Sequence, residues 1–132
     1  MKSIYIPIIL SVIVLSASSV MGGEAPKFFK DTYPEHALKS ALEARKILNG
    51  KDAALDAKTR ELISLGVAAQ IPCTYCVYIH TKNAKAAGAS EAEIREAVAA
   101  AAQIRLWSTV LNGMGYDFDA FKAEVDKIHS TK

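Results

Sequence analysis

Hydrophobic residues recur every three to four positions along most of the chain, from about residue 35 to residue 128. Ala, Leu, Glu and Lys predominate there, and the alternation of apolar and polar positions that marks half-buried strands is absent. A period of three to four places apolar side chains on one face of a helix. The pattern therefore predicts an all-α fold of about six helices in a single domain.

Capping and breaking residues mark where these helices begin and end. Pro34 suits the first turn of a helix, and Asn49-Gly50 is a stop signal after it. Asp56 and Ser90 are helix-capping residues, and Pro72 is placed to open a helix of its own. Residues 22–30 are predicted to form a leader into the folded part. The predicted helices are residues 34–48, 56–70 and 72–88, a segment from 90 through 101, a segment from 104 to 112, and residues 118–128.

Each predicted helix carries an apolar face that we expect to be buried. The run Ala99–Ala102 has only small side chains, which lets another helix approach closely. Trp107 is expected to supply a core or subunit contact. The positions expected to face inward are Leu38, Ala41, Leu42 and Leu48, then Leu62, Leu65 and Ala69, and then Ile94, Ala97, Val98 and Ala101. The stripe of Phe118, Phe121, Val125 and Ile128 on the last helix is expected, like Trp107, to supply a core or subunit contact.

The first 22 residues have the character of an export signal. Lys2 is the only charged residue before Glu24, and the segment from Ile4 to Leu15 is strongly apolar and is followed by small residues. We predict that residues 1–22 are a signal peptide, that residues 23–132 form the mature domain, and that this domain is periplasmic or secreted. A retained membrane anchor is the alternative, because the apolar run approaches the ~20 residues that span a bilayer.

The balance of charges narrows the possible partners. The chain holds 16 Lys and Arg against 14 Asp and Glu, so its mature part is close to neutral. It lacks the basic blocks and the aromatic-interleaved basic stripes of proteins that bind nucleic acid. We therefore expect no nucleic-acid partner.

Two cysteines, Cys73 and Cys76, are the only ones in the chain and lie three positions apart. An oxidising compartment would tend to join them. A loop this short constrains the unfolded chain by only about 2 kcal/mol, less than a bridge between distant residues would. Redox chemistry therefore explains the pair better than stabilisation does, with a passive bridge as the alternative.

Cys73, Cys76 and His80 fall on one stripe of the predicted helix. The two cysteine Cα atoms should lie roughly 5–5.5 Å apart, a spacing that permits a disulfide. An imidazole next to a thiol takes its proton and then stabilises the thiolate, which is the reactive form. The first helical turn also favours negative sulfur, and this argument alone points to Cys73 as the nucleophile.

Glu61 lies on the preceding predicted helix. If Ile71-Pro72 forms a tight turn, Glu61 and His80 come within about one helical turn of each other along the hairpin. Side chains lean toward the N-terminus of their own helix, so a bridging water is one possible arrangement. In this position Glu61 could hold the tautomer of the imidazole and relay protons through it.

The order Glu61, Cys73-Thr74-Tyr75-Cys76 and His80 resembles the signature of AhpD-like alkylhydroperoxidases within the carboxymuconolactone decarboxylase superfamily. The resemblance covers about residues 35–112 and includes the flanking segments 55–61, 80–84 and 88–94. A Cys-x-x-Cys pair alone is weak evidence. The glutamate twelve positions before it and the histidine four positions after it make the pattern specific.

The resemblance implies an all-helical fold that assembles as homotrimers or homohexamers. It implies that Cys76 attacks the peroxide, that Cys73 resolves the sulfenic acid as a disulfide, and that Glu61 and His80 relay protons to Cys76. Tyr75 matches a position near this relay. The position of His80, one turn from Cys76, also favours Cys76 as the nucleophile.

We therefore expect a thiol-dependent hydroperoxide reductase that needs no metal or organic cofactor and is recycled by a dithiol. An exported protein lacks free access to cytoplasmic reductants, so a dithiol–disulfide oxidoreductase acting on exported proteins is an alternative. Further alternatives are a lactone decarboxylase, on superfamily grounds alone, an oligomeric binding module with a structural bridge, and a zinc site. The zinc site would use Cys73, Cys76, His80 and Glu61, although both sulfurs and the imidazole on one helix make tetrahedral closure awkward.

Overall fold

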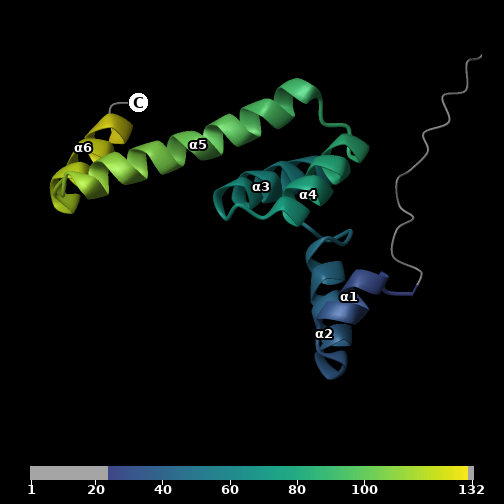
Figure 1. The fold of residues 1–132 in the computed structure, drawn as a ribbon. Coiled ribbons are helices and arrows are strands. Elements are labelled where there is room, and N and C mark those ends of the chain that lie inside the picture. Colours follow the sequence, from purple (N-terminus) through teal and green to yellow (C-terminus); the bar gives the residue numbers. More distant parts are fainter. Residues whose placement is uncertain (1–23, 131–132) are drawn as a thin grey trace, which may run out of the picture. The chain divides into compact units, whose positions relative to one another are not determined.

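The computed structural model describes residues 24–130, and every regular element in that range is an α-helix (Figure 1). The all-α prediction is thereby confirmed. The predicted signal segment, residues 1–22, lies outside the described residues. The helices are α1 (Lys27–Thr32), α2 (Glu35–Leu48), α3 (Ala57–Gln70), α4 (Thr74–Ala86), α5 (Glu91–Gly113) and α6 (Phe118–Ser130).

The chain divides after Gly50 into two units, which are described separately. In the first unit α1 packs against α2. Helix α1 falls partly within the segment predicted to be a leader, so that prediction is wrong; its six residues are too few to show a helical period. The inward-facing prediction is also wrong for Leu48, whose side chain is 72% exposed at the last position of α2.

The core of the second unit forms where α3 packs against α4 and against the first half of α5 (Figure 1). The described residues contain four buried apolar side chains, all of them here. Around this core lie partly buried apolar residues, among them Leu62 and Val77. The buried residues are Leu65, Ala68, Ala84 and Ile94.

Helices α3 and α5 approach closely at Gly66, as the run of small residues in α5 predicts. A Cβ atom built on Gly66 would lie 3.4 Å from the Cβ of Ala101 and 3.6 Å from the carbonyl oxygen of Ala97. The side chain of Gln70 also donates a hydrogen bond to the carbonyl of Ala101, at 2.5 Å. These contacts hold the C-terminal half of α3 against α5.

Helix α4 begins two residues later than predicted. Pro72 lies in the turn between α3 and α4, and the N–H of Cys73 donates to the carbonyl of Ala68, which closes the end of α3. Cys73 has an extended backbone and is the N-cap of α4, so the first helical residue is Thr74. The physical reason is that the backbone of Pro72 is not helical, because its φ is 21°, so Pro72 is not the first residue of α4.

Glycine stops α4 where the sequence places it. Gly88 has a φ of 87°, a left-handed conformation that glycine adopts without a steric penalty. The N–H groups of Gly88 and Ala89 donate to the carbonyls of Lys85 and Ala84, which are the two hydrogen bonds of a Schellman motif. The next helix begins with the predicted capping box between Ser90 and Glu93.

Helix α5 is one uninterrupted helix of 23 residues, so the prediction of two helices in this region is wrong. No glycine, proline or capping residue between Ala101 and Ile104 provides a break. The helix ends when the N–H of Tyr116 donates to the carbonyl of Leu111, with Gly115 at a φ of 59°.

The second half of α5 extends beyond α3 and α4 and is followed by α6 (Figure 1). Its apolar side chains are exposed in the single chain; Trp107, for example, is 57% exposed. Val98, predicted to face inward, is also exposed. Among residues 24–130 no helix combines the length and apolar character needed to cross a membrane. The exposed large side chains of this arm are Ile104, Leu106, Trp107, Val110, Met114, Tyr116, Phe118, Phe121 and Ile128.

Candidate functional site

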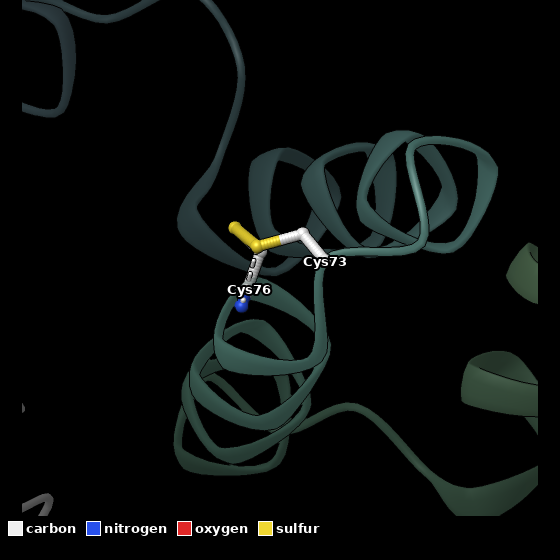
Figure 2. Close-up of a disulfide and its surroundings, with 2 residues drawn as sticks. All are labelled: Cys73 and Cys76. Atoms are coloured by element: carbon white, nitrogen blue, oxygen red, sulfur yellow. Dashed lines mark hydrogen bonds between the residues drawn. A yellow bond between two sulfur atoms is a disulfide. The ribbon is translucent and has the colours of Figure 1, made fainter.

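Cys73 and Cys76 form a disulfide at the start of α4 (Figure 2). Their Cα atoms are 5.2 Å apart, which agrees with the spacing expected from a single helical turn. Cys73 lies in the turn before the helix and Cys76 in its first turn, so closing the bridge leaves the helix intact.

The two sulfur atoms have different surroundings. The Sγ of Cys73 accepts a hydrogen bond from the backbone N–H of Cys76 at 3.2 Å, the position that the side-chain oxygen of a capping residue usually takes. It is therefore placed at the end of α4 where unpaired N–H groups favour negative charge. Cys76, in contrast, lines a pocket.

His80 and Glu61 are in direct contact across the hairpin of α3 and α4. The Nδ1 of His80 lies 2.6 Å from the Oε2 of Glu61, so no bridging water is needed. Their side chains are only 19% and 16% exposed. A partly buried carboxylate at this distance fixes the orientation of the imidazole ring.

A pocket of about 240 Å³ opens beside the disulfide. Cys76 and His80 contribute its reactive groups from α4, and α3 contributes most of the remaining wall. That wall is apolar apart from one hydroxyl, that of Ser64. The lining residues are Ile63, Ser64, Val67, Ala68, Ile71, Cys76 and His80.

The remaining candidate, Tyr75, does not line this pocket. Its side chain is 89% exposed. The structure therefore brings Glu61, His80 and the two cysteines together, and leaves Tyr75 on the surface next to them. Tyr78, one turn further along α4, is exposed as well and lies under the ammonium group of Lys82, 5.7 Å from the ring centroid.

An ion pair links the first turns of α3 and α5. Lys58 and Glu93 form an ion pair at 2.7 Å. The hydrogen bond from Lys58, followed by those from the backbone and side chain of Ser90, lowers the pKa of Glu93 to about 2. Asp56 caps α3 by accepting a hydrogen bond from the N–H of Thr59, and this bond lowers the pKa of Asp56.

Sequence reasoning missed the pocket wall on α3. Ser64, Ala68 and Ile71 follow Glu61 at intervals of three, seven and ten positions, so they share its helical face. That spacing could have identified Ser64 as a neighbour of the predicted relay. The exposure of Ile63, Val67 and Ile71 could not be foreseen, because apolar residues at helical spacing ordinarily indicate a buried face.

Within residues 24–130 no three His, Cys, Asp or Glu side chains are grouped so that they could hold a metal ion. The zinc alternative would use the sulfurs of Cys73 and Cys76, and in this structure both are joined in the disulfide. The described part of the chain therefore offers no preformed set of metal ligands in its disulfide form.

Two comparisons with known proteins bear on this arrangement. Residues 36–116 match the model of the carboxymuconolactone decarboxylase family. The chain is also similar to "Uncharacterized protein 4 in cox locus" of Paracoccus denitrificans, with 41% identity over 54 residues. That alignment covers 41% of this chain and 49% of the relative, so the chain spans about half the length of the curated relative that it matches.

Proposed function

Because the chain belongs to the carboxymuconolactone decarboxylase family, we propose that it works in the AhpD-like manner, as a thiol-dependent hydroperoxide reductase. The observation that carries the proposal is that Cys76 and His80 line one pocket while His80 binds Glu61. A thiol, an imidazole and an orienting carboxylate in this order are the parts that an activated sulfur nucleophile needs.

The first step oxidises Cys76. Its thiolate attacks the terminal oxygen of the hydroperoxide, the S–O bond forms and the O–O bond breaks. The departing alkoxide takes a proton from His80 and leaves as an alcohol. Glu61 keeps the imidazole oriented for this transfer.

The second step closes the disulfide. The thiolate of Cys73 attacks the Sγ of the Cys76 sulfenic acid, and hydroxide leaves with a proton as water. The 5.2 Å separation of the two Cα atoms supports this step, because both sulfurs can meet without unwinding α4. In sum, two thiols and one hydroperoxide give one disulfide, one alcohol and one water, and a dithiol must then return two electrons.

A dithiol–disulfide oxidoreductase that acts on exported proteins is the second candidate. The observation that favours it is the exposed apolar rim of the pocket, formed by Ile63 and Val67 on α3 and by Ile71 at its end. Such a rim is suited to contact with another protein or with an apolar substrate. The export signal predicted in residues 1–22 would place the protein in the periplasm or outside the cell, where disulfides persist.

The proposal includes assembly with copies of the same chain. Residues 24–130 hold four buried apolar side chains, a small core for a chain of this length. The arm formed by the second half of α5 and by α6 exposes large apolar residues, including Trp107 and Phe118. A second copy would cover this surface, and a homotrimer or homohexamer is the assembly we expect.

The test is a reaction of the reduced protein with cumene hydroperoxide, followed by mass spectrometry. Wild type should form the Cys73–Cys76 disulfide, and Cys73→Ser should stop at a sulfenic acid on Cys76 that dimedone traps. A Cys76→Ser variant should remain unoxidised under the same conditions. If neither sulfur of the wild-type protein reacts with the hydroperoxide, the peroxidase proposal is refuted. The oxidoreductase that acts on exported proteins is then the remaining candidate, and oxidation of a protein dithiol by the disulfide form would test it.

A further inference from the structure

The two sulfurs of the disulfide differ in what surrounds them. This difference determines which of the two an incoming thiol attacks. The Sγ of Cys73 accepts a hydrogen bond from the backbone N–H of Cys76 at the N-terminal end of α4. Cys76 and His80 line the pocket, whereas Cys73 is absent from its wall. One sulfur is therefore placed to receive negative charge, and the other to receive an incoming molecule.

We propose that a reducing dithiol enters through the pocket and attacks Cys76, so that Cys73 is the sulfur that leaves. This inference rests on the redox-active disulfide of the proposed function and adds to it the site of the mixed disulfide. It applies equally to a small dithiol and to a dithiol carried by a protein.

Reduction of the disulfide takes two successive thiolate attacks. A thiolate of the dithiol bonds to the Sγ of Cys76, the Cys73–Cys76 bond breaks, and its electron pair goes to Cys73. The second thiolate of the dithiol then attacks the dithiol's own sulfur in the mixed disulfide. Cys76 leaves, takes a proton from His80 and is reduced, while the dithiol departs as a disulfide.

Thiol–disulfide exchange depends on which sulfur can be reached and on how stable the departing thiolate is. Both cysteines are partly buried, but only Cys76 lines the pocket through which a substrate can approach. The N–H of Cys76 and the other free N–H groups of the first turn of α4 stabilise the Cys73 thiolate, because charge-assisted hydrogen bonds are stronger than neutral ones. Both factors favour the same direction of attack.

This direction is opposite to the one that the helix end alone would suggest. A sulfur at a helix N-terminus is commonly regarded as the nucleophile, and on that basis Cys73 would carry the mixed disulfide. Here the geometry assigns Cys73 a different task. Its stabilised thiolate is both a good leaving group during reduction and a ready nucleophile toward oxidised Cys76.

The first experiment compares the two sulfurs as targets. Cys73→Ser and Cys76→Ser are each loaded with 2-nitro-5-thiobenzoate on the remaining cysteine, and dithiothreitol is added. Thiobenzoate is the better leaving group, so its release reports attack on the protein sulfur. We expect release at least 10-fold faster from Cys76 than from Cys73. Equal rates, or a faster rate at Cys73, would overturn the proposal.

The second experiment uses the wild-type disulfide and therefore does not depend on the folding of either variant. The oxidised protein is treated with excess glutathione, quenched with acid and N-ethylmaleimide, and the segment from Glu61 to Lys82 is fragmented in the mass spectrometer. Glutathione should be found on Cys76 and the maleimide on Cys73. The reverse labelling, or an even mixture, contradicts the assignment. Neither experiment uses a hydroperoxide. If the peroxidase proposal is refuted, the results of both experiments therefore still decide which sulfur is attacked.

Discussion

The carboxylate of Glu61 and the imidazole of His80 touch across the α3–α4 hairpin, with 2.6 Å between Oε2 and Nδ1, although 19 positions separate them in the chain. Since Nδ1 is occupied by Glu61, Nε2 is the ring nitrogen left to exchange a proton in the pocket. Both side chains are largely shielded from solvent, and a low local dielectric strengthens a charge-assisted hydrogen bond. The hairpin therefore delivers an oriented imidazole beside Cys76.

Replacing Glu61 by glutamine should slow oxidation of Cys76 while leaving the fold intact. An amide keeps the shape of the carboxylate but carries no charge, so its hydrogen bond orients the imidazole less firmly. We therefore expect a loss on the order of 10- to 100-fold, below the full contribution of a general acid–base group. The measurement is the rate of sulfenic acid formation in Cys73→Ser as a function of pH, with and without Glu61→Gln.

The matched control is Glu96→Gln, which removes a carboxylate from an exposed position on α5. It should leave both the rate and its pH profile unchanged. A Glu61→Gln variant that reacts at the wild-type rate would show that the contact with His80 is structural only.

A second prediction concerns the close approach of α3 and α5. Gly66→Leu should destabilise the protein by about 1–3 kcal/mol, because a Cβ there already lies 3.4 Å from that of Ala101 and a larger side chain has no room. Thermal unfolding followed by circular dichroism measures the change. Gly113→Leu is the control, since a Cβ at that helical position meets nothing within 4 Å beyond its chain neighbours and the backbone of its own helix. This variant should unfold at or above the wild-type temperature. An equal fall in both variants would argue against tight packing at Gly66.

The sequence predicted the all-α class and most helix boundaries because local signals determine them. Asp56, Ser90 and Gly88 act through hydrogen bonds within a few residues, so their positions indicate where helices begin and end. The Glu61–His80 contact was also foreseeable, because a tight turn between two helices fixes which positions lie opposite each other. The prediction was wrong at Pro72. A proline can follow the end of one helix or open the next, and the sequence alone does not distinguish the two.

The exposed surfaces could not be predicted in the same way. Ile63 and Val67 on α3, and Trp107 on α5, follow the helical period of buried residues, yet they are exposed in the single chain. The helical spacing of apolar residues indicates that one face of the helix is apolar, but it does not indicate what covers that face. The pocket beside Cys76 exists because part of the apolar face of α3 is left uncovered.

A third prediction concerns acid stability. The pKa of Glu93 is lowered from 4.5 to about 2, chiefly by its hydrogen bond with Lys58. The unfolded chain takes up this proton near pH 4.5 and the folded protein only near pH 2, so the stabilisation is complete above pH 4.5 and is lost as the pH falls from 4.5 to 2. Glu93→Gln should therefore unfold at a temperature that varies less with pH in this window. Glu96→Gln, again the control, should retain the wild-type slope, and identical slopes in all three proteins would contradict the role of the ion pair.

The fourth prediction tests the proposed assembly through the arm of α5 and α6. Trp107 and Phe121 are exposed in the single chain, and burying such side chains is worth about 1.5–3 kcal/mol each for Phe-sized groups. If copies of the chain cover the arm, the combined change Trp107→Glu and Phe121→Glu places charges in an apolar interface and should reduce the mass measured by light scattering to that of smaller species. Lys122→Glu, at an exposed position on the same arm, controls for added negative charge and should keep the wild-type mass. A wild-type protein that is monomeric at micromolar concentration would remove the homo-oligomer, and the exposed apolar arm would then require a different partner.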